Sequence, residues 1–111
     1  MLGNDFFDRV TYVNFGNTEI TDAELTCLHG LSRLRTLDLR NTEITDSGLK
    51  QIAGLTSVRH LFLDNTPVTD AGLEHLKRLY LEWLTLRGTP GITERGMEEF
   101  KESSWCCKIE Y

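Results

Sequence analysis

The string RNTEITDSGL, at residues 40–49, recurs with small changes three more times along the chain. The related strings are GNTEITDAEL from residue 16, DNTPVTDAGL from residue 64 and RGTPGITERGM from residue 87, so that successive strings begin about 24 residues apart. A fixed period of this length is typical of repeat architectures, in which small units stack on one another. The chain is therefore predicted to be a stack of about four similar units.

Apolar residues keep the same period and indicate what each unit is. Leu37 and Leu39 flank a polar residue, which is the alternation of a short strand, whereas Leu49 and Ile52 are spaced like one face of a helix. Each unit is therefore predicted to contain a strand, a turn and a helix. The two inward strand positions are held in turn by Val13, Leu37, Leu61 and Leu84, and by Phe15, Leu39, Leu63 and Leu86.

The turn between strand and helix also has a repeated chemistry. Asparagine and glycine tolerate left-handed backbone, which is predicted at Asn17, Asn41, Asn65 and Gly88. A threonine that can cap the helix is followed by an acidic residue at the positive end of the helix dipole. These pairs are Thr21–Asp22, Thr45–Asp46, Thr69–Asp70 and Thr93–Glu94. Gly30 and Gly54 stand where a helix C-terminus favours a left-handed residue.

One such unit cannot bury its apolar face alone, whereas stacked units bury a continuous core. The pattern L-x-x-L-x-L-x-x-T-x-I-T-D-x-G-L-x-x-L-x-x-L resembles the leucine-rich repeat family over about residues 10–109. It is most similar to the TDxGL-type repeats of ribonuclease-inhibitor-like, F-box-associated and many bacterial repeat proteins. The resemblance implies an α/β, right-handed solenoid of about four strand–turn–helix units plus a C-terminal strand. Its parallel sheet would form the concave face and its short helices the convex face.

The whole chain, residues 1–111, is expected to form one domain. Its parts are an N-terminal cap at 1–9, units at about 10–33, 34–57, 58–80 and 81–103, and a capping strand at 104–111. The family usually has Asn or Cys where Thr18, Thr42, Thr66 and Thr89 stand. Because a hydroxyl makes only part of an amide's hydrogen bonds, the ladder between turns is expected to be shorter or water-assisted.

Both ends of the predicted stack are thinly covered. Phe6 and Phe7 are placed to cover the first unit, and Cys107 and Ile109 are expected to point inward from the fifth strand. Repeat stacks normally need polar terminal caps. A fragment of a longer array, or a chain that pairs with a second copy, is therefore an alternative interpretation.

Composition excludes several classes of function. The net charge of −5 and the pI near 5.1 argue against a nucleic-acid binder, which needs a basic surface. No apolar run approaches the ~18 residues of a membrane span, and the acidic start does not resemble a signal peptide. Three cysteines, two of them adjacent, make a poor disulfide framework, so a reducing, cytoplasmic setting is expected.

Side chains on the concave face are expected to form three columns across five strands. Neighbouring parallel strands lie ~4.8 Å apart, so adjacent members of a column should touch. The columns are Tyr12, Thr36, His60, Trp83 and Cys106; Asn14, Asp38, Phe62, Thr85 and Lys108; and Gly16, Arg40, Asp64, Arg87 and Glu110. The third column alternates in charge, which suits either a self-satisfied surface ladder or a polar rim for a partner.

His60, Phe62 and Trp83 should lie next to one another, with Tyr12 at the margin. Aromatic residues dominate interface hot spots, although cross-strand aromatic pairs also stabilise sheets by themselves. Catalysis is not expected, because no Ser or Cys nucleophile is placed beside a histidine. No metal or cofactor is expected either, since Cys106–Cys107 has no histidine near it in sequence and phosphate-binding glycine motifs are missing.

These observations favour a non-catalytic protein–protein interaction module that binds another protein through its concave sheet face. The alternative is a structural segment of a longer repeat scaffold that self-associates through its ends. Family resemblance alone also admits a substrate-recognition arm of a ubiquitin-ligase-like assembly, although nothing in the sequence resembles an F-box. The predicted partner-binding residues are Tyr12, Asp38, Arg40, His60, Phe62, Asp64, Trp83 and Arg87.

Overall fold

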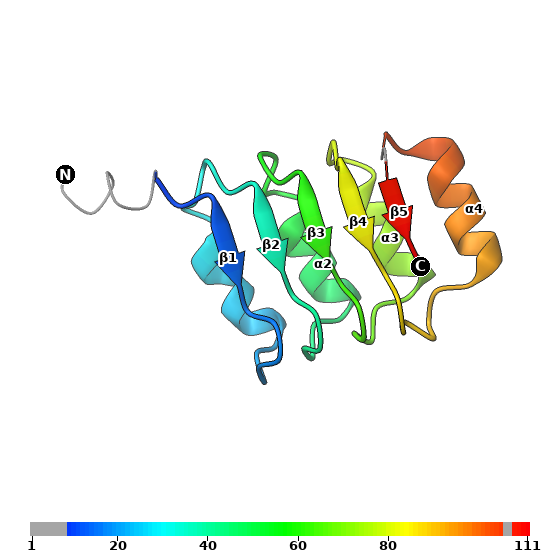
Figure 1. The fold of residues 1–111 in the computed structure, drawn as a ribbon, viewed down its shortest axis with the longest axis horizontal. Coiled ribbons are helices and arrows are strands. Elements are labelled where there is room, and N and C mark those ends of the chain that lie inside the picture. Colours follow the sequence, from blue (N-terminus) through cyan, green and yellow to red (C-terminus); the bar gives the residue numbers. More distant parts are fainter. Residues whose placement is uncertain (1–8, 106–107) are drawn as a thin grey trace.

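The structure of the chain is a computed structural model that describes residues 9–105 and 108–111. Short strands alternate with short helices, and the strands pair in parallel in the order β1-β2-β3-β4-β5. Figure 1 shows the strands side by side in chain order, with helices against one face of the sheet. The elements are β1 (Tyr12–Asn14), the 3-10 helix η1 (Asp22–Leu28), β2 (Thr36–Asp38), α2 (Asp46–Ile52), β3 (His60–Phe62), α3 (Asp70–Leu76), β4 (Trp83–Thr85), α4 (Glu94–Ser103) and β5 (Lys108–Glu110).

The core lies between the sheet and the helices. Leu37 pairs in register with Leu61, and Leu61 with Leu84, and all three side chains are fully buried. Leu49 and Leu73 face them from α2 and α3 and are equally buried. The predicted stacking of equivalent leucines is therefore confirmed.

The predicted left-handed turns are confirmed in all four units, and the predicted threonine caps are confirmed in three of them. Left-handed φ values occur at Asn17 (62°), Asn41 (58°), Asn65 (57°) and Gly88 (69°). The hydroxyl oxygens of three of the predicted caps accept hydrogen bonds from helical N–H groups: Thr45 from Ser47, Thr69 from Ala71, and Thr93 from Gly96.

The prediction for the helix C-termini is wrong. Neither Gly30 nor Gly54 is among the left-handed residues of the described chain. The N–H of Gly54 donates to the Gln51 carbonyl at 3.1 Å, and that of Leu55 donates to the Ile52 carbonyl at 2.8 Å. Because these 3-10-type bonds tighten the last turn and satisfy its carbonyls, no left-handed residue is needed.

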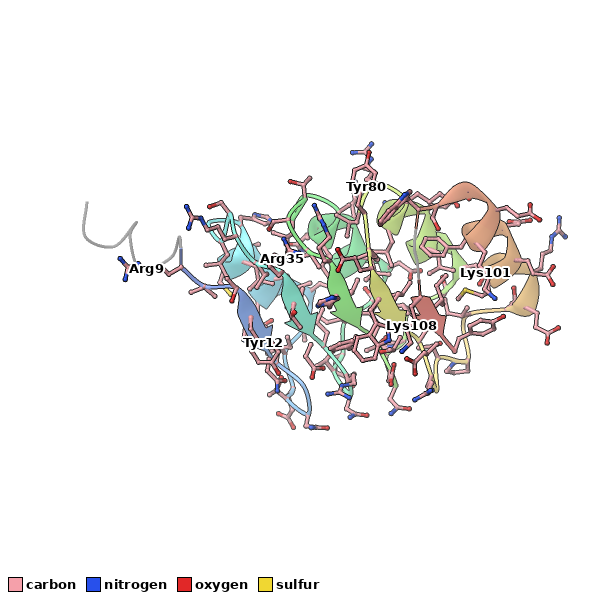
Figure 2. The ribbon with its side chains drawn as sticks, turned by 45° about the horizontal axis from the view of Figure 1, so that its top comes forward. Arg9, Tyr12, Arg35, Tyr80, Lys101 and Lys108 are labelled. Atoms are coloured by element: carbon pink, nitrogen blue, oxygen red, sulfur yellow. The ribbon has the colours of Figure 1, made fainter. Side chains whose placement is uncertain are left out.

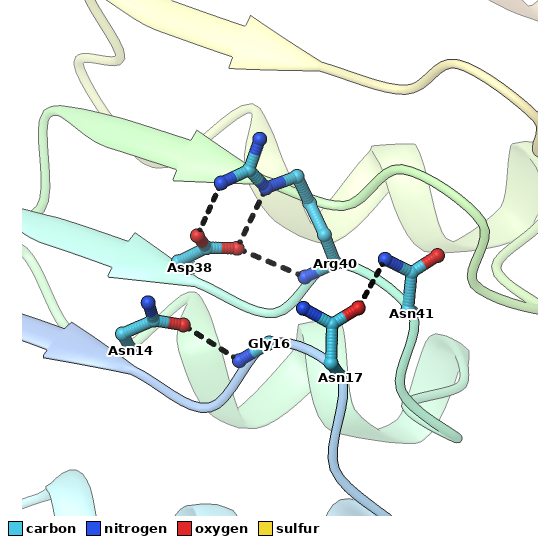
Figure 3. Close-up of polar contacts among 6 residues, drawn as sticks. All are labelled: Asn14, Gly16, Asn17, Asp38, Arg40 and Asn41. Atoms are coloured by element: carbon cyan, nitrogen blue, oxygen red, sulfur yellow. Dashed lines mark hydrogen bonds and ion pairs between the residues drawn. The ribbon is translucent and has the colours of Figure 1, made fainter.

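The expected threonine ladder is also replaced by a different one. Thr42 donates its hydroxyl hydrogen to the Leu39 carbonyl of its own unit at 2.7 Å, and Thr18, Thr66 and Thr89 do the same three residues back. The units are linked by asparagine instead. The Asn41 amide donates to Asn17 Oδ1 at 2.7 Å, as Figure 3 shows, and the Asn65 amide donates to Asn41 Oδ1 at 2.8 Å.

The register of the fifth strand differs from the prediction by two residues. Lys108 pairs with Trp83, and Glu110 with Thr85, whereas the sequence spacing predicts Cys106 beside Trp83. One added residue lies in the turn at Gly91. The other lies between the helix and the strand, because Met97 and Ile109 are 12 residues apart whereas Leu73 and Leu84 are 11 apart. An added Cβ at Gly91 would collide with the Val68 carbonyl, so glycine admits this close approach. The expectations for Phe6, Phe7, Cys106 and Cys107 lie outside the described residues.

Candidate functional site

The face of the sheet opposite the helices, called here the open sheet face, carries every second side chain of each strand. Side chains on the other face are buried in the core, as Leu37 and Leu61 are. In Figure 2 the labelled Tyr12 and Lys108 mark the first and last strands of this surface. The open sheet face consists of Tyr12, Asn14, Thr36, Asp38, His60, Phe62, Trp83, Thr85, Lys108 and Glu110.

An aromatic cluster lies at the centre of the open sheet face, as predicted. The ring centroids of Phe62 and Trp83 are 5.0 Å apart at an interplanar angle of 80°, and those of His60 and Trp83 are 6.3 Å apart at 76°. Both are edge-to-face geometries, which aromatic quadrupoles favour. All three side chains are half-buried, so the cluster is partly open to solvent.

Two cations flank this cluster on either side across the sheet, Arg40 just after β2 and Lys108 on β5. The guanidinium carbon of Arg40 lies 5.4 Å from the Phe62 ring centroid, and Lys108 Nζ lies 4.7 Å from the Trp83 ring. Both distances fall within the range of cation–π attraction. The sequence spacing predicts Lys108 beside Thr85, so it misses the contact of Lys108 with Trp83.

The orientation of Trp83 is set by Glu110. The indole N–H donates to Glu110 Oε2 at 2.8 Å, and Arg87 Nη2 donates to Glu110 Oε1 at 2.5 Å. The hydrogen bond from Trp83, followed by those from Lys108 and the charge of Arg87, lowers the pKa of Glu110 below its ordinary value. Glu110 is therefore ionised at neutral pH and accepts hydrogen bonds from both Trp83 and Arg87.

Asp38 fixes the position of Arg40, as Figure 3 shows. Arg40 Nε donates to Asp38 Oδ1 at 3.0 Å, Nη2 donates to Oδ2 at 2.7 Å, and the Arg40 backbone N–H donates to Oδ1 at 3.1 Å. Asp38 is only 2% exposed, so a direct contact between it and a partner does not fit this geometry. Its role is to orient the guanidinium, whose side chain remains 49% exposed.

The ionisation of Asp38 should make stability depend on acid pH. Burial raises the pKa of Asp38, but the hydrogen bonds and charge of Arg40 outweigh burial, so the folded pKa lies below the ordinary value. The carboxylate therefore contributes stability that is complete above the unfolded pKa of ~3.9 and is lost as pH falls through the folded pKa. We expect Asp38→Asn to flatten the acid slope in urea unfolding curves from pH 6 to pH 2.5. Exposed Glu98→Gln is the control, and an unchanged slope in Asp38→Asn would contradict this assignment.

The predicted charge ladder along the third column is only partly formed. Arg87 pairs with Glu110, but Arg40 pairs with Asp38 on its own strand and not with Asp64. The Asp64 carboxylate instead accepts the Arg87 backbone N–H at 3.2 Å. The ladder fails because Asp38, two residues earlier, presents both oxygens to Arg40 as a fork.

The remaining predicted residues have separate environments. His60 Nδ1 lies 3.1 Å from the Thr36 hydroxyl and Nε2 lies 3.4 Å from Glu82 Oε1. The contact with Thr36 agrees with the predicted first column, whereas the contact with Glu82 is not apparent from the sequence. Tyr12 is 55% exposed on the outer strand β1 and is not in ring contact with the aromatic cluster.

Two cavities of the described chain lie away from the predicted site. Cavities of ≈210 and ≈150 Å³ contain none of the predicted site residues; the larger is lined by His29, Leu31, Ser32, Gly54, Leu55, Thr56 and Ser57. Within residues 9–105 and 108–111, no three His, Cys, Asp or Glu side chains are grouped so that they could hold a metal ion. No helix in this part of the chain has the length and apolar character needed to cross a membrane.

Comparisons with known proteins agree with this architecture. The sequence model described as leucine rich repeat matches residues 8–68. The chain belongs to the leucine-rich repeat family. The solved structure of leiomodin-1 actin-binding site 2 resembles this leucine-rich repeat chain with a TM-score of 0.75 and 23% identity, over 98% of this chain and 73% of that one. At this identity the likeness shows the fold. No curated protein matches the sequence.

Proposed function

We propose that this leucine-rich repeat chain is a non-catalytic interaction module that binds a partner protein through the open sheet face. The observation that carries the proposal is the half-open Phe62–Trp83 pair, which Glu110 holds in place. Rigid, partly exposed aromatic side chains lose little conformational entropy on binding and are enriched in hot spots. His60 on β3 and Tyr12 on β1 extend the surface toward the first strand of the sheet.

The charged residues beside the aromatic pair determine how a partner would be oriented on this surface. Arg87 is 65% exposed, and Arg40 is 49% exposed although its position is fixed. Both guanidinium groups can form forked hydrogen bonds with carboxylates. We therefore expect the partner to place an apolar side chain on Phe62 and Trp83 and acidic groups beside Arg40 and Arg87. Asp64 completes the polar edge of this surface.

The family and the structural neighbour support the class of function and not a particular partner. Leucine-rich repeats are scaffolds whose function depends on the side chains that they display. The similar solved structure is an actin-binding site of leiomodin-1. The shared fold supports a protein-binding role for this chain.

Truncation of the aromatic pair should weaken binding strongly. We expect Phe62→Ala/Trp83→Ala to weaken partner capture at least tenfold, because hot-spot truncations cost ~2 kcal/mol or more and ~1.4 kcal/mol corresponds to a factor of ten. The measurement is quantitative mass spectrometry of proteins retained by wild-type and variant chains from the same extract. Arg95→Ala, on α4, is the matched control. A folded double variant that retains the same partners would remove the proposal.

A structural role in a longer or self-associated stack is the second candidate, and the first unit favours it. Val13 and Phe15 are only partly buried, whereas their counterparts Leu37 and Leu39 are fully buried. Apolar surface at that end is thus less covered by the described residues. Sedimentation equilibrium tests this candidate: reversible dimers at high protein concentration would support it, and a monomer throughout would contradict it.

A further inference from the structure

A ladder of carboxylates joins successive units at their helix starts. Asp22 Oδ1 accepts the backbone N–H of Thr45 at 2.9 Å, and Oδ2 accepts its hydroxyl at 2.5 Å. Asp46 makes the same two bonds to Thr69, at 2.7 and 2.5 Å, and Asp70 makes them to Thr93, at 2.8 and 2.6 Å. Each unit therefore satisfies two donors of the unit that follows it.

A glycine makes room for each incoming carboxylate. Gly48 follows Thr45 by three residues, and an added Cβ there would collide with Asp22. Gly72 and Gly96 stand in the same relation to Asp46 and Asp70. The repeated TDxGL string therefore contains both sides of the contact between units. Its aspartate accepts hydrogen bonds from the threonine of the following unit. Its own threonine and glycine form a socket for the aspartate of the preceding unit.

The first unit departs from this pattern at one residue. Its string is TDAEL, so that Glu24 stands where the later units have glycine. Glu24 Oε2 accepts the Thr21 backbone N–H at 3.0 Å and the Thr21 hydroxyl at 2.8 Å. These are the two donors that an aspartate from a preceding unit would take. The same hydrogen bonds lower the pKa of Glu24, so the carboxylate is charged at neutral pH.

We propose that Glu24 closes the N-terminal end of the Asp–Thr ladder by filling the Thr21 socket from within its own unit. An aspartate arriving from another TDxGL unit would meet the Glu24 side chain and its like charge, and would find both Thr21 donors occupied. The Thr21 socket is therefore closed to the aspartate of such a unit, and self-association at this end would use apolar contacts at Val13 and Phe15 instead. Any stack that continues at this end does so without an Asp–Thr contact.

Amide hydrogen exchange at Thr21 tests the contact directly. We expect Thr21 in Glu24→Gly to exchange at least about tenfold faster than in the wild type, because its acceptor is lost. Glu24→Gln is the matched variant: its amide oxygen can still accept, so most protection should remain. Glu19→Gln, an exposed change in the same loop, should have no effect. Equal exchange rates in the wild type, Glu24→Gln and Glu24→Gly would overturn the proposal.

Addition of one unit tests whether the end is closed. A copy of residues 34–57, inserted directly before Val10, would place its own aspartate opposite Thr21. In the Glu24→Gly chain this unit should dock and raise Tm by roughly 4 °C or more relative to the same chain without it. In the wild-type and Glu24→Gln chains, the rise should be clearly smaller. An equal or larger rise with Glu24 present would show that the socket is open.

Discussion

Replacing Leu61 by alanine will lower the free energy of unfolding by about 2–5 kcal/mol, the range for buried leucine truncations. Leu61 is fully buried at the centre of the middle strand β3 and pairs in register with Leu37 and Leu84. The cavity therefore opens between two neighbouring units, and the rigid strands on both sides limit collapse around it. Urea denaturation followed by circular dichroism gives the difference from the midpoint and slope.

A matched control separates packing from the mere loss of a side chain. Glu98→Ala, on the exposed side of α4, should change stability by no more than about 0.5 kcal/mol. A loss of under ~1 kcal/mol for Leu61→Ala would mean that the stack of equivalent leucines is not the main support of the fold.

Gly72→Ala should be destabilising although alanine is the better helix former. In an unobstructed helix this change would stabilise by up to ~1 kcal/mol. Here an added Cβ would collide with the Asp46 carboxylate and with Leu49 from the preceding unit. Relief of that collision disturbs the two hydrogen bonds between Asp46 and Thr69. We expect a net loss of about 1–3 kcal/mol, typical of overpacking, measured by urea unfolding.

The sign of this effect is what identifies the collision. Gly30→Ala is the control, because nothing lies within 4 Å of a Cβ added there. In an Asp46→Ala background, Gly72→Ala should cost less than it does in the wild type, which a double-mutant cycle measures. Stabilisation by Gly72→Ala in the wild-type chain would rule out the proposed fit between the units.

Much of the candidate site could be predicted because the strands repeat with a known spacing. His60, Phe62 and Trp83 come together as expected, since they occupy equivalent positions on adjacent paired strands. The sequence places Asp64 beside Arg40, whereas the structure pairs Arg40 with Asp38, two residues earlier in the same unit. Sequence spacing alone gives no distance that decides between these two carboxylates.

The sequence by itself determined the stack of units, the left-handed turns and the helix starts. These features depend on local backbone preference and on a repeated apolar pattern, and both are present in the sequence of every unit. Only the tertiary structure decided how one unit contacts the next. The role of Asp22 as an acceptor for Thr45, and of Glu24 as a substitute for such an acceptor, depends on side chains meeting across units. The pairing of Lys108 with Trp83 likewise depends on how an extra turn residue is accommodated in three dimensions.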